Sequence, residues 1–108
     1  MYVQMKFYFS KQAEKHLDDI YEFIKTKSEN AADNIYNEIL DEIEILKSFP
    51  EMAPIEPSLI DFPETFRALV VRKTYKAIYY IKNNTIHISA IWDCRQNPNK
   101  LKSKIKKN

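Results

Sequence analysis

The chain has 108 residues, of which 44% are hydrophobic and 13% aromatic, with no glycine and one cysteine. This length and composition are typical of one folded domain, so we expect residues 1–108 to form a single domain. The absence of glycine excludes glycine-rich phosphate loops, and the single Cys94 excludes an internal disulfide and a cysteine-based zinc site. We therefore expect no metal, no cofactor, a cytoplasmic location and no membrane segment.

The net charge of +2 conceals an uneven distribution of charged side chains along the chain. Residues 1–64 carry 14 acidic and 6 basic side chains, whereas residues 65–108 carry 1 acidic and 11 basic ones. A strongly basic half favours an anionic partner, either a nucleic acid or an acidic protein surface. The alternative is that the lysines only keep the surface soluble.

The first two elements are a strand and a helix. Apolar and polar residues alternate over residues 2–9, which is the pattern of a strand. Ser10 follows as the expected N-cap, and apolar residues then recur at helical spacing over residues 11–27.

A second helix is expected over residues 31–48, with Asn30 as its N-cap. Because the link between the two helices is short, they should form an antiparallel helical hairpin. Four prolines interrupt residues 49–64, which predicts a loop that lies over the surface.

Three strands complete the expected sheet, at residues 66–71, 75–82 and 85–95. The last two are joined by Asn83 and Asn84, which predict a type I′ turn because asparagine tolerates positive φ. The basic tail from about residue 99 is expected to be either a short helix or flexible.

The register counted outward from the asparagine turn places Tyr80 opposite His87 and Tyr75 opposite Trp92. Side chains alternate along a strand, so one face should be core and the other open. The expected core face carries Tyr75, Ala77, Tyr79, Ile81, Ile86, Ile88, Ala90 and Trp92. The expected open face carries Lys76, Tyr80, Lys82, His87, Ser89, Asp93 and Arg95 around Ile78 and Ile91.

The predicted fold class is α+β, with the order β-α-α-β-β-β. We expect an antiparallel sheet with the first strand at an edge, a helical hairpin packed on one face, and the other face uncovered.

The opening strand and five segments that follow it in order resemble one known family, the RelE/ParE superfamily of toxins from bacterial type II toxin–antitoxin systems, which includes plasmid stabilisation proteins. The segments are S-x-x-A-x-x-x-L-x-x-I-Y-x-F-I from Ser10, L-x-x-F-P from Leu46, F-R-x-L-V-V from Phe66, Y-K-A-I-Y-Y-I from Tyr75 and I-W-D-C-R from Ile91. The resemblance extends over nearly the whole chain.

This resemblance implies a growth-inhibiting toxin that a cognate antitoxin neutralises in a hetero-oligomer, with the C-terminal segment of the antitoxin folding onto the toxin. It also implies one of two activities. RelE-like members cleave mRNA on the ribosome without a metal, whereas ParE-like members inhibit DNA gyrase and have no catalytic site.

Metal-free RNA cleavage requires a base for the ribose 2′-OH, cations for the phosphate and an acid for the leaving oxygen. The candidate residues for these roles are Arg67, Lys73, Lys76, His87, Asp93 and Arg95. The expected register places Lys76, Asp93 and Arg95 near one another. Asp93 is alternatively an ion-pair partner that fixes Arg95 or Lys76.

The end of the last strand bears on the choice between the two activities. Nuclease-active relatives have a histidine or tyrosine there, but this chain has Trp92, Asp93, Cys94 and Arg95. The difference favours ParE-like inhibition of gyrase. The alternatives are a RelE-like ribosome-dependent mRNA endonuclease and a non-toxic homologue that only binds a partner.

Partner binding is expected at Tyr80, the aromatic residue of the open face that can stack on RNA or pack on a protein. Further candidates are Lys100, Lys102 and Lys104 in the basic tail. The tail has three interpretations: it steers the protein to RNA or DNA, it binds an acidic antitoxin or gyrase, or it only solubilises the chain end.

Overall fold

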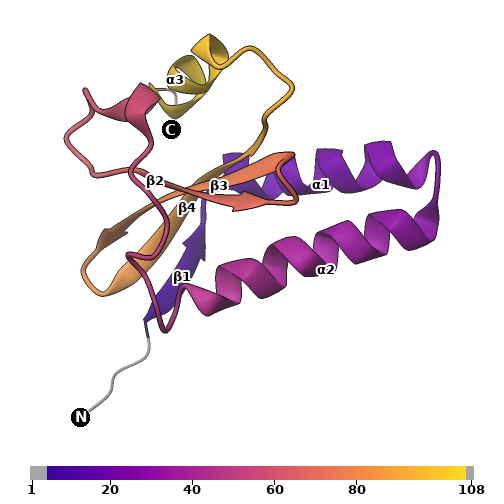
Figure 1. Ribbon diagram of the computed structural model, residues 1–108, viewed down its shortest axis with the longest axis horizontal. Helices are drawn as coiled ribbons and strands as arrows, with labels where there is room; N and C mark the ends of the chain where they lie inside the picture. Colours follow the sequence, from indigo (N-terminus) through magenta and orange to yellow (C-terminus); the bar gives the residue numbers. More distant parts are fainter. Residues whose placement is uncertain (1–4, 107–108) are drawn as a thin grey trace.

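The computed structural model describes residues 5–106, which form one mixed sheet, a long helical hairpin and a C-terminal helix (Figure 1). The strands are β1 (Lys6–Phe9), β2 (Arg67–Val71), β3 (Tyr75–Lys82) and β4 (Thr85–Asp93). The helices are α1 (Lys11–Lys25), α2 (Glu29–Ile45), the short 3₁₀ helix η1 (Pro57–Leu59) and α3 (Asn99–Lys106). In the part of the chain described, no helix is long and apolar enough to cross a membrane.

The sheet has the order β1-β4-β3-β2, so β1 lies at an edge as predicted. The expectation of an antiparallel sheet was wrong for this strand, because β1 runs parallel to β4, with Phe7 opposite Ile86. Alternating residues define the two faces of a strand but not the direction in which it pairs, since both directions satisfy the backbone. The sheet is therefore mixed.

Both long helices begin at a serine. The Ser10 hydroxyl accepts a hydrogen bond of 3.0 Å from the Ala13 amide, so the predicted cap of α1 is confirmed. The N-cap of α2 is Ser28, which accepts from the Ala31 amide at 3.1 Å, and not the predicted Asn30. The hairpin of α1 and α2 covers one face of the sheet, where it encloses the larger hydrophobic core.

The hairpin of β3 and β4 is joined as predicted by Asn83 and Asn84, whose φ angles are 52° and 59°. Tyr80 lies opposite His87, which confirms the register near the turn. Beyond it, Ser89 is an extra residue, because Tyr79 pairs with Ile88 while Ile78 pairs with Ala90. This β-bulge shifts the remaining register by one residue.

The bulge reverses the faces of the last part of β4, so the faces predicted for this part were wrong. Ile91 packs in the core beneath the helical hairpin, whereas Ala90 and Trp92 belong to a second core on the opposite face. Asp93, and not Trp92, lies opposite Tyr75.

The second face of the sheet is not uncovered, as we had predicted. The loop after α2 and helix α3 lie over it, on the side away from the helical hairpin (Figure 1). The second core consists of Leu59, Phe66, Ala68, Ile78, Ala90, Trp92, Leu101 and Ile105. Residues 99–106 of the basic tail thus form helix α3, which packs through Leu101 and Ile105, while residues 107–108 of the tail lie outside the described residues.

Candidate functional site

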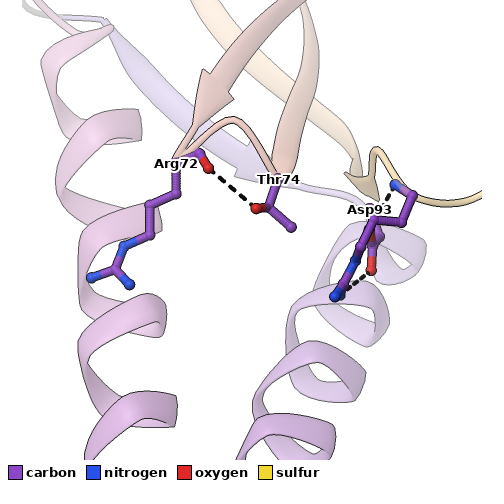
Figure 2. Close-up of polar contacts among 4 residues, drawn as sticks. Arg72, Thr74 and Asp93 are labelled. Atoms are coloured by element: carbon purple, nitrogen blue, oxygen red, sulfur yellow. Dashed lines mark hydrogen bonds and ion pairs between the residues drawn. The ribbon is translucent and has the colours of Figure 1, made fainter.

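The carboxyl end of β4 carries a bidentate ion pair between Asp93 and Arg95 (Figure 2). Arg95 Nε donates to Asp93 Oδ1 at 3.0 Å, and Arg95 Nη2 donates to Asp93 Oδ2 at 2.7 Å. The Arg95 backbone amide also donates to Oδ1, at 2.9 Å. These bonds from Arg95 hold the pKa of Asp93 below its ordinary value, although partial burial opposes them. The alternative interpretation of Asp93 as an ion-pair partner of Arg95 agrees with this geometry.

A cavity of about 430 Å³ opens beside this pair, between α1, the ends of β3 and β4, and α3. Its lining includes His16, which the sequence analysis missed. The Ile91 amide donates a hydrogen bond of 3.2 Å to His16 Nδ1. Burial and the nearby Lys104 lower the pKa of His16, which keeps the ring neutral and Nδ1 able to accept. His16 follows Ala13 by three residues and precedes Ile20 by four, so its place on the apolar stripe of α1 was the available signal.

A second cavity, of about 320 Å³, adjoins the first between α1 and the turn from β2 to β3. The two cavities share Phe23, Tyr75 and Arg95 in their linings, so they form one continuous depression. We call this depression the sheet-end groove. Its lining includes His16, Asp19, Ile20, Phe23, Ile24, Lys27, Ile35, Arg72, Thr74, Tyr75, Ile91, Trp92, Asp93, Arg95, Gln96 and Lys104.

Arg72 and Asp93 mark two neighbouring tips of the sheet, between the two long helices (Figure 2). Arg72 Nε donates to Glu38 Oε1 at 2.7 Å, which ties the turn to α2. The Thr74 hydroxyl donates to the Arg72 carbonyl at 3.1 Å, which closes the turn (Figure 2). The candidate Lys73 lies in this turn with φ of 60°.

A second recess lies on the other face of the sheet and is aromatic. The Tyr80 and His87 rings stack with their centroids 4.7 Å apart and their planes 6° apart. Tyr8 meets His87 edge-on at 5.9 Å, and Phe66 meets Tyr80 edge-on at 5.3 Å. These four residues, which we call the aromatic cluster, line part of a cavity of about 390 Å³. Burial raises the pKa of Tyr80 above its ordinary value of 10.0.

Lys76 does not lie with Asp93 and Arg95, as we had expected. Its Nζ donates at 2.8 Å to the carboxylate of Glu56, a residue that is only 6% exposed. The bulge at Ser89 explains the error, because it places Asp93 on the face of α1 while Lys76 stays on the face of the second core.

Two more of the predicted cations, Arg67 and Lys102, are engaged by carbonyl or carboxylate groups. Arg67 Nη1 donates to the carbonyls of Glu51 and Ala53, at 3.2 and 2.8 Å. Lys102 Nζ donates to Asp61 at 2.7 Å. Lys104 lines the sheet-end groove, and Lys100 is exposed.

The structure does not bring the six candidate nuclease residues together. His87 and Asp93 are six residues apart on β4, a separation of about 20 Å at the usual rise of a strand. They also face opposite sides of the sheet. Arg67 and Lys76 contact the loop after α2, and Lys73 lies in the β2–β3 turn.

The fold and these surfaces define a small α+β protein with a helical hairpin on a mixed sheet and two surface recesses. The family model described as the ParE toxin of the type II toxin–antitoxin system parDE matches residues 7–98. The chain therefore belongs to the ParE toxin family, and the resemblance to the RelE/ParE superfamily is confirmed.

One similar structure is described as the chromosomal ParDE TA system from P. aeruginosa. It has a TM-score of 0.68 and 21% sequence identity, over 83% of this chain and 96% of that chain. At this identity the likeness establishes the fold. No curated protein sequence matches the chain.

Proposed function

We propose that this chain is a non-enzymatic toxin that inhibits DNA gyrase in the cytoplasm and is neutralised by a cognate antitoxin. Membership of the ParE toxin family supports the toxin role. ParE-like members of the superfamily act on gyrase without a catalytic site of their own, so a chain of this family acts by docking rather than by bond cleavage.

The pairing of Arg95 with Asp93 is the observation that carries the choice of mechanism. A nuclease needs cations that face the phosphate together with a base and an acid. In this chain Arg95 is neutralised by Asp93, and Lys76 is neutralised by Glu56. Each carboxylate offsets the charge that its cation would offer to a phosphate, and His87, the remaining candidate acid or base, lies on the face of the sheet opposite to Asp93 and Arg95.

The partner proposed for neutralisation is an antitoxin encoded beside the toxin, whose C-terminal segment folds onto it. The chain offers such a segment two recesses, the sheet-end groove and the aromatic cluster.

A supercoiling assay with purified gyrase and no ribosomes tests the proposal. The purified chain should abolish supercoiling, and adding the product of the adjacent reading frame should restore it. A translation extract treated in parallel should show no new mRNA ends. Ribosome-dependent cuts that disappear in Arg67→Ala or Arg95→Ala, but not in the exposed control Lys82→Ala, would establish the nuclease activity instead. Induced expression without any growth defect would refute both toxic activities.

A further inference from the structure

We propose that the sheet-end groove is the docking site of the cognate antitoxin. The antitoxin segment that binds there combines a large apolar side chain with flanking carboxylates. This inference rests on the proposed function, because it names the surface that the neutralising partner occupies.

The floor of the groove is apolar at its centre. Phe23 is 55% exposed and lies where the two cavities join, beside Tyr75. Ile20 lines the first cavity and Ile24 lines the second. Recesses for ligands commonly have volumes of roughly 300–1,000 Å³, and cavities of about 430 and 320 Å³ fall in this range. A leucine or aromatic side chain of a partner would cover Phe23 and remove its ring from water.

The rim of the groove is cationic at both ends. Four basic side chains line it against two acidic ones: the basic residues are Lys27, Arg72, Arg95 and Lys104, and the acidic residues are Asp19 and Asp93. Arg72 and Arg95 already have carboxylate partners within the chain. Among residues 5–106, however, neither Lys27 nor Lys104 takes part in an ion pair.

The positions of these two lysines define the expected partner. Lys104 lines the first cavity, whereas Lys27 lines the second and holds its Nζ 4.9 Å from the centre of the Phe23 ring. A segment whose apolar side chain covers Phe23 would thus bring one carboxylate to each lysine. Such a segment is an acidic amphipathic peptide of the kind that binds in grooves.

The charges of the groove favour a peptide over a nucleic acid. A bound strand would bring several phosphates next to Asp19 and Asp93, and it would leave the aliphatic floor without apolar contacts. The aromatic cluster is the competing surface for a peptide, but Glu64 is the charged residue in its lining, and no lysine or arginine lines it among the described residues. An acidic segment is therefore better matched to the sheet-end groove.

The test uses the full chain and the purified product of the adjacent reading frame. The dissociation constant is measured by calorimetry for Phe23→Ala and Lys27→Glu in the groove. Matched controls are Ile60→Ala, an apolar residue that is 68% exposed on the loop, and Lys82→Glu at the far hairpin. Circular dichroism verifies that each variant is folded.

We expect each groove variant to raise the dissociation constant at least about tenfold, the effect of losing one well-packed anchor, and each control to change it less than about twofold.

Unchanged binding by both groove variants would overturn the inference while leaving the proposed function standing. A larger effect of Tyr8→Ala than of Phe23→Ala would assign the segment to the aromatic cluster instead. If the wild-type chain does not bind the product of the adjacent reading frame at all, the part of the proposed function that concerns neutralisation by an antitoxin is refuted as well. Tight binding of a single-stranded 20-mer that Lys27→Glu abolishes would identify the groove as a nucleic-acid site.

Discussion

Lys76 on β3 donates a hydrogen bond of 2.8 Å to the carboxylate of Glu56, in the loop that follows α2. The same carboxylate accepts from the backbone amide and the hydroxyl of Ser58, at 3.2 and 2.8 Å. Burial by itself would raise the pKa of Glu56, but the bonds from Lys76 and Ser58 outweigh it and lower the pKa. A charged, almost fully buried glutamate therefore fastens the proline-containing loop to the sheet.

Replacing Glu56 by alanine should destabilise the protein by about 2–3 kcal/mol, because Lys76 loses its partner and the two Ser58 groups lose their acceptor. Urea unfolding at pH 7 measures this loss. The control is Glu51→Ala, which removes a largely exposed carboxylate 3.5 Å from Arg67 and should cost less than about 1 kcal/mol. Equal effects of the two substitutions would contradict the role given to Glu56.

Helix α3 should be an integral part of the fold and not a loose tail, because Leu101 is only 2% exposed in the core that contains Trp92. Leu101→Ala should cost about 2–4 kcal/mol and shift the fluorescence emission of Trp92 to longer wavelength as water reaches the ring. Lys100→Ala, on the exposed side of the same helix, should change neither quantity. An unchanged Trp92 emission in Leu101→Ala would mean that α3 does not cover the sheet in solution.

The sequence predicted the register of the β3–β4 hairpin correctly as far as Ile88, because two adjacent asparagines define a turn that sets its own pairing. It could not reveal the bulge. Ala90, Ile91 and Trp92 are consecutive apolar residues, so their pattern is the same whichever face each one takes. A one-residue insertion in such a run leaves no mark in the alternation.

That single error spread to the prediction of the site. In the predicted register the second face of the sheet had no hydrophobic core. We therefore had no reason to expect that Leu101 and Ile105 would pack against that face. The same error also placed Lys76 beside Asp93. Glu56 was missed for another reason, since a proline-rich loop has no periodicity from which the burial of a side chain can be inferred.

His16 should make the protein less stable as the pH falls. Burial and Lys104 lower its pKa from 6.5, with a smaller contribution from Lys15 and an opposing one from Asp19, so the folded state binds the proton less readily than the unfolded chain does. Its contribution is fully present above pH 6.5 and is lost as the pH falls toward the lower value in the folded protein. Protonation of Nδ1 would also remove the hydrogen bond that His16 accepts from the Ile91 amide.

A nuclear magnetic resonance titration should give a midpoint for the His16 ring below 6.5. Urea unfolding at pH 7.5 and 5.5 should show a smaller loss of stability in His16→Gln than in the wild type, because glutamine can accept from the amide but does not titrate. A His16 midpoint at or above 6.5 would contradict this prediction.

The two helix caps should differ in their contribution to stability, although both are serines. The Ser10 hydroxyl accepts from the Ala13 amide and also donates at 3.1 Å to the carbonyl of Ser89, the bulged residue. The Ser28 hydroxyl accepts from Ala31 in an exposed position. Ser10→Ala therefore removes a helix cap together with a contact between α1 and the bulge, whereas Ser28→Ala removes a cap at the exposed tip of the helical hairpin.

We expect Ser10→Ala to cost about 2 kcal/mol and Ser28→Ala about 1 kcal/mol, as measured by urea unfolding of both variants under the same conditions. Ser10→Thr keeps a hydroxyl that can accept and donate, and should recover most of the loss. The comparison also tests the bulge, because a regular β4 would present no Ser89 carbonyl to Ser10 and the two caps would then be equivalent. Equal costs for the two alanine variants would show that the bulge contributes nothing to the attachment of α1.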